Sequence, residues 1–200
     1  MPSLKKLLLL VTLPLYVLDQ WTKWWIVGKF PEPPPGYHSV EEHQAVVEGW
    51  FNLVRVHNQG VAFGMGNGSD WAPVVFLCVP LLAMLVIRIF WKKGVFATGL
   101  ARVAVALLLC GIWGNLTDRL TQGFALESLK GDSFWHRLSA GYVVDFISVK
   151  LPYFEKLSPS SGGWWPSFNV ADSCICVAAT LLFISGLREE KKAKQAEASA

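Results

Sequence analysis

The sequence predicts an all-α membrane protein with four transmembrane helices, a small extracytoplasmic β-sheet and surface loops. Three observations predict this fold class. The 200 residues are 52% hydrophobic and only 16% charged, with a mean hydropathy of +0.37, which is too apolar for an ordinary soluble domain of this size. Four apolar stretches are each long enough to cross a bilayer. The polar segments between them contain the alternating pattern typical of β-strands.

Each predicted span contains roughly 20 residues, the length needed to cross a hydrocarbon core at about 1.5 Å per residue. We place the spans, within one domain of residues 1–187, at about residues 4–27, 72–91, 98–116 and 170–187. The first span resembles a signal peptide because Lys5 and Lys6 precede its apolar run. Asp19 and the sequence WTKWW follow that run in place of a cleavage site of small residues, so we expect this span to be retained.

Basic residues indicate the orientation of the spans, because cytoplasmic loops carry an excess of Lys and Arg. Such residues precede the first span, connect the second to the third and follow the fourth: Lys5, Lys6, Arg88, Lys92, Lys93, Arg188, Lys191, Lys192 and Lys194. We therefore expect both termini to be cytoplasmic and residues 28–71 and 117–169 to lie outside. The polar tail, residues 188–200, should be a disordered segment or a frayed helix end in the cytoplasm.

The outer segments contain two predicted strands. A proline-rich stretch at residues 30–44 cannot be a continuous helix. WFNLVRVHNQGVAFGM then alternates apolar and polar residues before a turn with glycines, and GYVVDFISVK is rich in β-branched and aromatic residues. We expect a small sheet on the membrane surface, with tryptophans at the outer interface: Trp21, Trp24, Trp25, Trp50, Trp71, Trp164 and Trp165. The glycines of the turn are Gly60, Gly64 and Gly66.

The composition argues against several classes of function. A net charge of +3 is too small to indicate a nucleic-acid partner. We expect no metal and no cofactor, because the histidines lack metal-binding spacing and the cysteines lie inside predicted spans without histidine partners. No predicted span pairs a serine with Lys or His, as a membrane serine peptidase would require. The residues concerned are His38, His43, His57, His136, Cys78, Cys110, Cys174 and Cys176.

Four aspartates from distant parts of the chain are predicted to reach one depth at the outer side of the membrane. Polar side chains accompany them there, and the whole set is Asp19, Asp118, Asp145, Asp172, Asn58, Asn115, Arg119 and Asn169. Two carboxyl groups held close together in a partly dry site share one proton. One can then activate water while the other protonates a leaving group, which is aspartic-peptidase chemistry without metal or cofactor.

Structural roles are open alternatives for most of these aspartates. Asp172 or Ser173 could cap the fourth helix, and Asp118 could form a charge pair with Arg119. Asp19 and Lys23 are spaced i, i+4 on one helical face and could neutralise each other. A structural role is hardest to assign to Asp145, because strand interiors disfavour aspartate.

Five motifs together resemble the lipoprotein signal peptidase family, also called signal peptidase II. In chain order they are DQWTK (19–23), NQGVAFG (58–64), GNLTDRL (114–120), VVDFI (143–147) and FNVADS (168–173). Each motif alone is weakly specific, but the ordered set with four spans and cytoplasmic termini covers most of the chain from about residue 10 to 187.

The resemblance implies a membrane aspartic endopeptidase of the bacterial inner membrane, with its active site near the periplasmic face. Its partner would be a lipidated prolipoprotein, cut before the diacylglyceryl-modified cysteine, and membrane lipid would surround it. By matching positions, Asp145 and Asp172 are the catalytic pair. Residues expected at the substrate are Asn58, Asn115, Arg119 and Asn169, and residues expected to support the site are Asp19, Lys23, Gly60 and Asp118. We expect a monomer.

Two outer segments are longer than the resemblance leads us to expect, residues 120–142 and 151–167. Surface loops tolerate added length at small entropic cost, so these segments could form a lid or a substrate-selecting surface. A proton-coupled transporter is the main alternative function, since proton relays also use carboxylates at membrane depth. Four short spans without an inverted repeat make a transport path hard to build. A scaffold protein is a third possibility.

Overall fold

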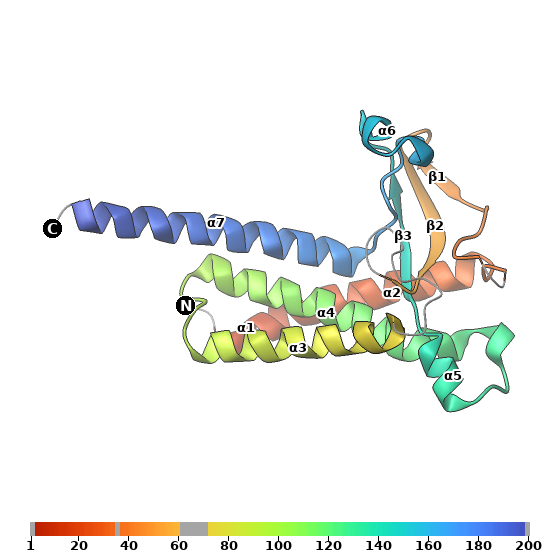
Figure 1. Ribbon diagram of the computed structural model, residues 1–200, viewed down its shortest axis with the longest axis horizontal. Coiled ribbons are helices and arrows are strands. Elements are labelled where there is room, and N and C mark those ends of the chain that lie inside the picture. Colours follow the sequence, from red (N-terminus) through yellow and green to blue (C-terminus); the bar gives the residue numbers. More distant parts are fainter. Residues whose placement is uncertain (1–2, 35–36, 61–71, 199–200) are drawn as a thin grey trace.

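The computed structural model describes residues 3–34, 37–60 and 72–198, and within them the chain is mostly helical with a small sheet at one end of a helical bundle (Figure 1). The main helices run side by side along the long axis, and the C-terminus lies at the end far from the sheet (Figure 1). The elements in chain order are α1 Leu4–Leu7, η1 Leu8–Thr12, α2 Leu13–Lys29, β1 Gln44–Val47, β2 Phe51–Asn58, α3 Ala72–Lys92, α4 Gly99–Ala125, η3 Glu127–Leu129, α5 Phe134–Ser139, β3 Val143–Val149, α6 Phe154–Leu157, η4 Pro159–Ser161 and α7 Val170–Ala198.

Three helices of the described chain, α3, α4 and α7, are long and apolar enough to span a membrane. Each corresponds to a span expected from the sequence. The first expected span, residues 4–27, is helical in three consecutive pieces, because the π-helical turn η1 separates α1 from α2. Pro14, in the first turn of α2, has no N–H, and its ring crowds the carbonyl one turn earlier, which explains why the regular helix is interrupted there.

Two helices extend beyond the expected spans. Helix α4 continues past residue 116 to Ala125, and α7 continues through most of the polar tail to Ala198. The tail contains strong helix formers, and Lys194 pairs with Glu190 one turn earlier at 2.6 Å. Helix propensity and this i, i+4 pair therefore extend the helix where the sequence led us to expect disorder or a frayed end.

The sheet has the order β1-β2-β3, and both neighbouring pairs are antiparallel. Strands β2 and β3 are the two strands expected from the sequence, while the short exposed strand β1 was not expected. One face of the sheet packs on the C-terminal end of α2 through a buried cluster of Ile26, Phe30, Tyr142, Val144 and Phe146. Of the turn glycines, Gly60 is described, and Gly64 and Gly66 lie outside the described residues.

Helices α4 and α7 pack closely because α4 presents glycines to α7. A Cβ atom on Gly111 would lie 2.6 Å from the carbonyl oxygen of Ala171, and one on Gly114 would lie 2.9 Å from the Ala171 Cβ. These approaches are too close for any larger residue without backbone movement. The glycines thus set the distance between α4 and the beginning of α7.

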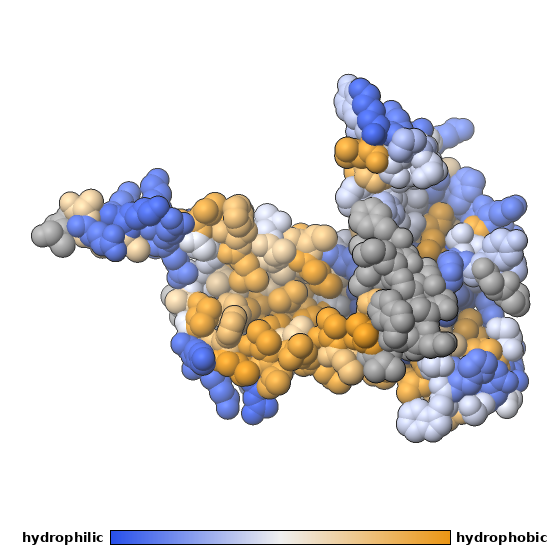
Figure 2. Space-filling model, viewed as in Figure 1, coloured by the Kyte–Doolittle hydropathy of each residue, from blue (hydrophilic) through white to orange (hydrophobic). Residues whose placement is uncertain are grey.

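The surface of the bundle is apolar along its length, and blue, hydrophilic residues lie at the C-terminal end and around the sheet (Figure 2). Exposed side chains on α3 and α7 contribute to this band, including Val79, Leu81, Leu82, Leu85, Val177 and Phe183. A continuous exposed apolar band between polar ends is the surface expected of a protein that lies in a bilayer.

Gly111→Ala should destabilise the folded protein by about 1–3 kcal/mol, because the added methyl group overpacks the contact with α7. Gly186→Ala is the matched control: it lies in α7 with open space around its Cβ position, and alanine should stabilise the helix by about 0.5–1 kcal/mol. Thermal unfolding in detergent would compare the two variants. Equal melting temperatures would show that α4 and α7 do not pack as described.

Candidate active site

A fully buried ion cluster lies where α2 meets α4. The ammonium group of Lys23 is 2.9 Å from Asp19 and 3.1 Å from Asp118, and all three side chains have no exposed surface. Such charges are costly to bury unless they are paired and hydrogen-bonded. The i, i+4 pairing of Asp19 with Lys23 expected from the sequence is present. The possible pair of Asp118 with Arg119 is replaced by the contact of Asp118 with Lys23.

The two carboxylates of this cluster also hold the backbone next to the predicted catalytic residues. Asp19 accepts a hydrogen bond from the N–H of Ala171 at 2.8 Å, and Asp118 accepts one from the N–H of Val144 at 3.0 Å. Ala171 precedes Asp172 and Val144 precedes Asp145 in the chain. The ion cluster therefore fixes the positions of α7 and β3 at the two points that matter most for the site.

Gln20 completes the cluster, although its role was not expected from the sequence. Its side-chain amide donates to Asp19 at 3.2 Å, to Asp118 at 3.0 Å and to the carbonyl of Gly114 at 3.1 Å. Its place in the DQWTK motif, directly after Asp19, was the signal that could have identified it.

Asn115 connects the ion cluster to Asp172. Its side-chain oxygen accepts hydrogen bonds from Lys23 at 3.0 Å and from Asn169 at 3.2 Å. Its amide nitrogen donates to Asp172 at 2.8 Å. Because the oxygen is held by two donors, the amide is fixed in the orientation that directs its N–H group at the carboxylate.

Asn169 and Asp172 form a reciprocal cap at the beginning of α7. The Asn169 side-chain oxygen accepts the N–H of Asp172 at 2.9 Å, and the Asp172 carboxylate accepts the N–H of Asn169 at 3.1 Å. This is the pattern of a capping box, with Asn and Asp in the places of Ser and Glu. The cap residue is thus Asn169 rather than Asp172 or Ser173, although Asp172 takes part in the capping.

Asp145 lies on β3 and is only 2% exposed. Its carboxyl oxygens accept hydrogen bonds from the amides of Asn58 at 2.9 Å and Asn169 at 2.8 Å. Asn58 is placed by the pairing of β2 with β3, in which it lies opposite Val143, on the same sheet face as Asp145. Asn169 therefore contacts both Asp145 and Asp172, and it joins the two carboxyl groups in one cluster.

The environment of Asp145 favours its protonated form. Burial, and then the negative charge of nearby Asp172, raise the pKa of Asp145 to about 8. The hydrogen bonds from Asn58 and Asn169 act in the opposite direction but do not outweigh burial. Asp172 is less buried than Asp145, so the two carboxyl groups have different environments, as acid and base require.

Arg119 lies beside this cluster. Its guanidinium donates to the carbonyl of Gly60 at 2.8 Å and lies over the ring of Phe76, 5.1 Å from the centroid. It is close enough to attract the carboxylates of Asp145 and Asp172. Its Nε atom is buried and has no hydrogen-bond partner within the described parts of the chain. Gly60 also donates its N–H to Asn58 at 3.0 Å.

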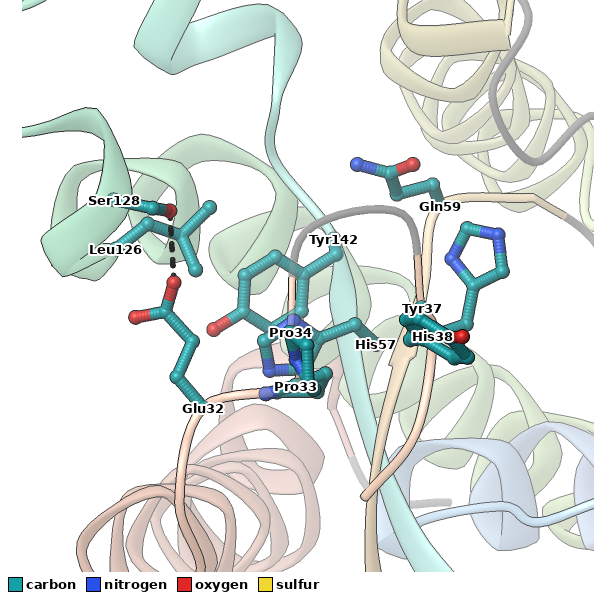
Figure 3. A pocket seen from close by; sticks show the side chains of 10 residues that line it. All are labelled: Glu32, Pro33, Pro34, Tyr37, His38, His57, Gln59, Leu126, Ser128 and Tyr142. Carbon is teal, nitrogen blue, oxygen red and sulfur yellow. Dashed lines mark hydrogen bonds between the residues drawn. The ribbon is translucent and has the colours of Figure 1, made fainter. Parts of the chain in front are cut away.

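The opposite face of the sheet carries a separate hollow of about 290 Å³ (Figure 3). The rings of His57 and Tyr142, which line it, stack with centroids 3.6 Å apart. At one side, the hydroxyl group of Ser128 donates a hydrogen bond to the carboxylate of Glu32. His57 pairs with Val144 and therefore faces away from Asp145. Burial, together with the charge of Arg55, lowers the pKa of His57 to about 3, so the ring is neutral near pH 7.

The described residues contain no group of three or more His, Cys, Asp or Glu side chains that could hold a metal ion. Within the same residues, the polar set predicted from the sequence forms two connected clusters. The first cluster contains Asp145, Asp172, Asn58, Asn115 and Asn169. The second contains Asp19, Lys23 and Asp118, and a hydrogen bond from Lys23 to Asn115 connects the two clusters.

Comparison with known proteins gives the family of this chain. The model of the family described as signal peptidase (SPase) II matches residues 11–188. The chain belongs to the signal peptidase II family. Similar curated proteins, each called a lipoprotein signal peptidase, come from Halalkalibacterium halodurans (28% identical, covering 93% of this chain and 95% of that protein) and Geobacter metallireducens (34% identical, covering 74% of each).

Solved structures share the fold of this chain. A structure described as a bacterial membrane enzyme, determined by the in meso method at 2.3 Å resolution, has a TM-score of 0.68 and 22% sequence identity. The match covers 92% of this chain and 90% of that one. A second such membrane enzyme, at 1.9 Å resolution, has a TM-score of 0.62. The family match, together with three described helices that are long and apolar enough to span a membrane, supports a multi-pass membrane protein of bacterial type.

Lys23→Met should lower the free energy of unfolding by about 3–5 kcal/mol, because it leaves two buried carboxylates without their cation. Lys130→Met is the matched control, since Lys130 and its partner Glu127 are both largely exposed and such pairs stabilise proteins little. Denaturant or thermal unfolding in detergent would measure both. Equal stability of the two variants would contradict the structural role of the buried cluster.

Proposed function

We propose that this protein is an aspartic endopeptidase that removes the signal peptide from diacylglyceryl-modified bacterial prolipoproteins and cuts before the lipidated cysteine. Its membership of the signal peptidase II family makes it a peptidase that acts on prolipoproteins. The observation that carries the aspartic mechanism is the joining of Asp145 and Asp172 through Asn169, with the pKa of Asp145 raised by burial.

In the proposed reaction Asp172 is the general base and Asp145 the general acid. The ionised Asp172 takes a proton from a water molecule, whose oxygen attacks the scissile carbonyl carbon, while Asp145 gives its proton to the carbonyl oxygen. The carbon–nitrogen bond of the tetrahedral intermediate then breaks. The cysteine nitrogen takes the proton held by Asp172, and the carbonyl re-forms as its hydroxyl proton returns to Asp145.

The neighbouring side chains hold the two carboxyl groups in place. Asn58 and Asn169 direct Asp145, and Asn115 directs Asp172, through the hydrogen bonds described above. We assign these three asparagines mainly to positioning, because their amide groups are occupied by the aspartates. Arg119, with a buried Nε that has no partner in the described residues, is the group we assign to a substrate carbonyl.

We propose that the protein crosses the inner membrane four times, with the helical stretch from Leu4 to Lys29 as the first span. The distribution of basic residues supports cytoplasmic termini and a dyad near the periplasmic face. A doubly acylated substrate cannot leave the lipid, so its scissile bond is presented at this boundary, where water is also available. The proton-coupled transporter considered as an alternative receives no support from the family.

Asp145→Asn and Asp172→Asn should each reduce cleavage of a diacylglyceryl-modified precursor by at least about 100-fold, because each removes a proton-transfer group. Both variants should stay folded and inserted in the membrane. Asp132→Asn, at an exposed position where the carboxylate bonds to His136, is the matched control and should cleave normally. Near-normal turnover by either dyad variant would show that the dyad is wrongly assigned.

The rate of cleavage should also report the proton on Asp145. The pKa of Asp145 is raised to about 8, so the acid is present below that pH, and kcat/KM should fall as pH rises through about 8. Asn58→Ala removes a hydrogen bond that lowers the pKa of Asp145, so the alkaline limb should move to higher pH.

Asn52→Ala is the control for this pH profile, because Asn52 lies on the same strand, opposite Ser148 and away from Asp145. Its alkaline limb should coincide with that of the unmodified enzyme. An alkaline limb that does not move in Asn58→Ala, or that moves to lower pH, would contradict the assignment of the general acid to Asp145.

A further inference from the structure

The chain between β3 and α7 forms a closed structure, residues 150–165, which we call the tip. Two backbone hydrogen bonds join its ends. The N–H of Leu151 donates to the carbonyl of Gly163 at 2.9 Å, and the N–H of Trp165 donates to the carbonyl of Val149 at 2.8 Å. Helix α6 and the turn η4 lie between these ends. The tip therefore follows directly from β3, and it overlaps residues 151–167, one of the two outer segments that are longer than the family resemblance leads us to expect.

The tip has its own small core and still leaves apolar side chains exposed. Phe154 is 8% exposed and packs on the ring of Trp165 with centroids 5.0 Å apart. In contrast Leu157 is 83% exposed and Tyr153 is 70% exposed, and Leu151 is exposed as well. The tip thus exposes three large apolar side chains within one short segment rather than a single scattered one.

Tyr153 has the only positive φ angle among the non-glycine residues that the structure describes, at 65°. Left-handed backbone of this kind favours glycine and is costly for a bulky side chain. The Tyr153 ring is exposed, and the ammonium group of Lys156 lies 5.0 Å from its centroid. The tip thus keeps an exposed aromatic ring beside a lysine at a backbone position where glycine would fold more easily.

The position of the tip beside the bundle indicates which surface it meets. The strands run across the bundle axis, so that α6 lies to the side of the helices at about the level where α7 begins (Figure 1). Orange, apolar surface at the tip faces the same side as the apolar band of the helices (Figure 2). In a membrane that contains these helices, this part of the tip would lie over lipid.

We propose that the tip rests on the outer leaflet of the bilayer and holds the sheet at the height of the lipid headgroups. Leu157 and Leu151 enter the boundary of the acyl chains, Tyr153 lies among the headgroups, and Lys150 and Lys156 meet lipid phosphates. Leucine with tyrosine and lysine is the combination of side chains found at membrane interfaces. This inference rests on the membrane orientation given under the proposed function.

A contact at this place would act on the active site through β3. Asp145 lies four residues before the last residue of that strand, and the tip begins directly after it. Lipid contact at the tip and the ion cluster at Asp118 therefore hold β3 on both sides of Asp145. The tip would keep the dyad at the depth where a lipid-anchored substrate presents its scissile bond.

A depth measurement tests this contact without any need for activity. A fluorescent amino acid would replace Leu157 or, as the matched control, Trp135, which is 75% exposed on α5. Helix α5 contacts α4 at Gly123, about 12 Å beyond Asn115 at 1.5 Å per residue, and thus lies further from the membrane. Each protein would be placed in nanodiscs of phosphatidylethanolamine and phosphatidylglycerol that contain lipid spin-labelled at the headgroup.

We expect quenching at position 157 to exceed that at position 135 about twofold or more, and to be lost in detergent without spin-labelled lipid. Equal quenching at the two positions would overturn the proposal. Because the fluorophore is itself apolar, Leu157→Glu provides a second readout. The ratio of its cleavage rate in nanodiscs to that in detergent should fall, whereas Trp135→Glu should keep the ratio of the unmodified enzyme.

An unchanged ratio for Leu157→Glu would also count against the tip contact. The two parts of the test separate this inference from the proposed function. If the enzyme cleaved no lipidated precursor under any condition, the proposed function would fail, while the quenching result would still decide whether the tip meets lipid.

Discussion

The ammonium group of Lys23 lies between Asp19 and Asp118 with no access to water, and the rest of the structure is arranged around this contact. One cation faces two carboxyl groups in this buried site. The backbone N–H groups of Ala171 and Val144 and the amide of Gln20 also donate hydrogen bonds to these carboxyl groups, as buried polar groups require. Since removing one partner would leave a buried charge unpaired, α2, α4, α7 and β3 are held to one another at this point.

The ion cluster and the dyad are two parts of one polar network. Each predicted catalytic aspartate follows a residue whose N–H is bound by a carboxylate of the cluster, and Asn115 connects Lys23 directly to Asp172. Asn169 then connects Asp172 to Asp145. Strand β3 and helix α7 are thus positioned relative to each other by one continuous set of hydrogen bonds and ion pairs.

Local signals in the sequence were sufficient for much of this structure. Apolar runs predicted α3, α4 and α7, β-branched residues predicted β3, and the i, i+4 spacing predicted the contact of Asp19 with Lys23. The partner of Asp118 could not be predicted, because Lys23 is distant in sequence and the contact depends on helix packing. Strand β1 is short, exposed and polar at its start, so it lacks the pattern of a half-buried strand. The capping box of Asn169 and Asp172 had a local signal, an Asn three residues before an Asp, which was not used.

In the proposed mechanism, Asp145 carries the shared proton of the dyad at neutral pH. Difference infrared spectroscopy of the carboxyl stretch, comparing the unmodified enzyme with Asp145→Asn, measures this proton directly. The band of a protonated carboxyl group should be present in the enzyme near pH 7, disappear as pH rises through about 8, and be absent from the variant. A band that persists unchanged in Asp145→Asn, or an enzyme whose carboxyl groups are all ionised near pH 7, would contradict the account.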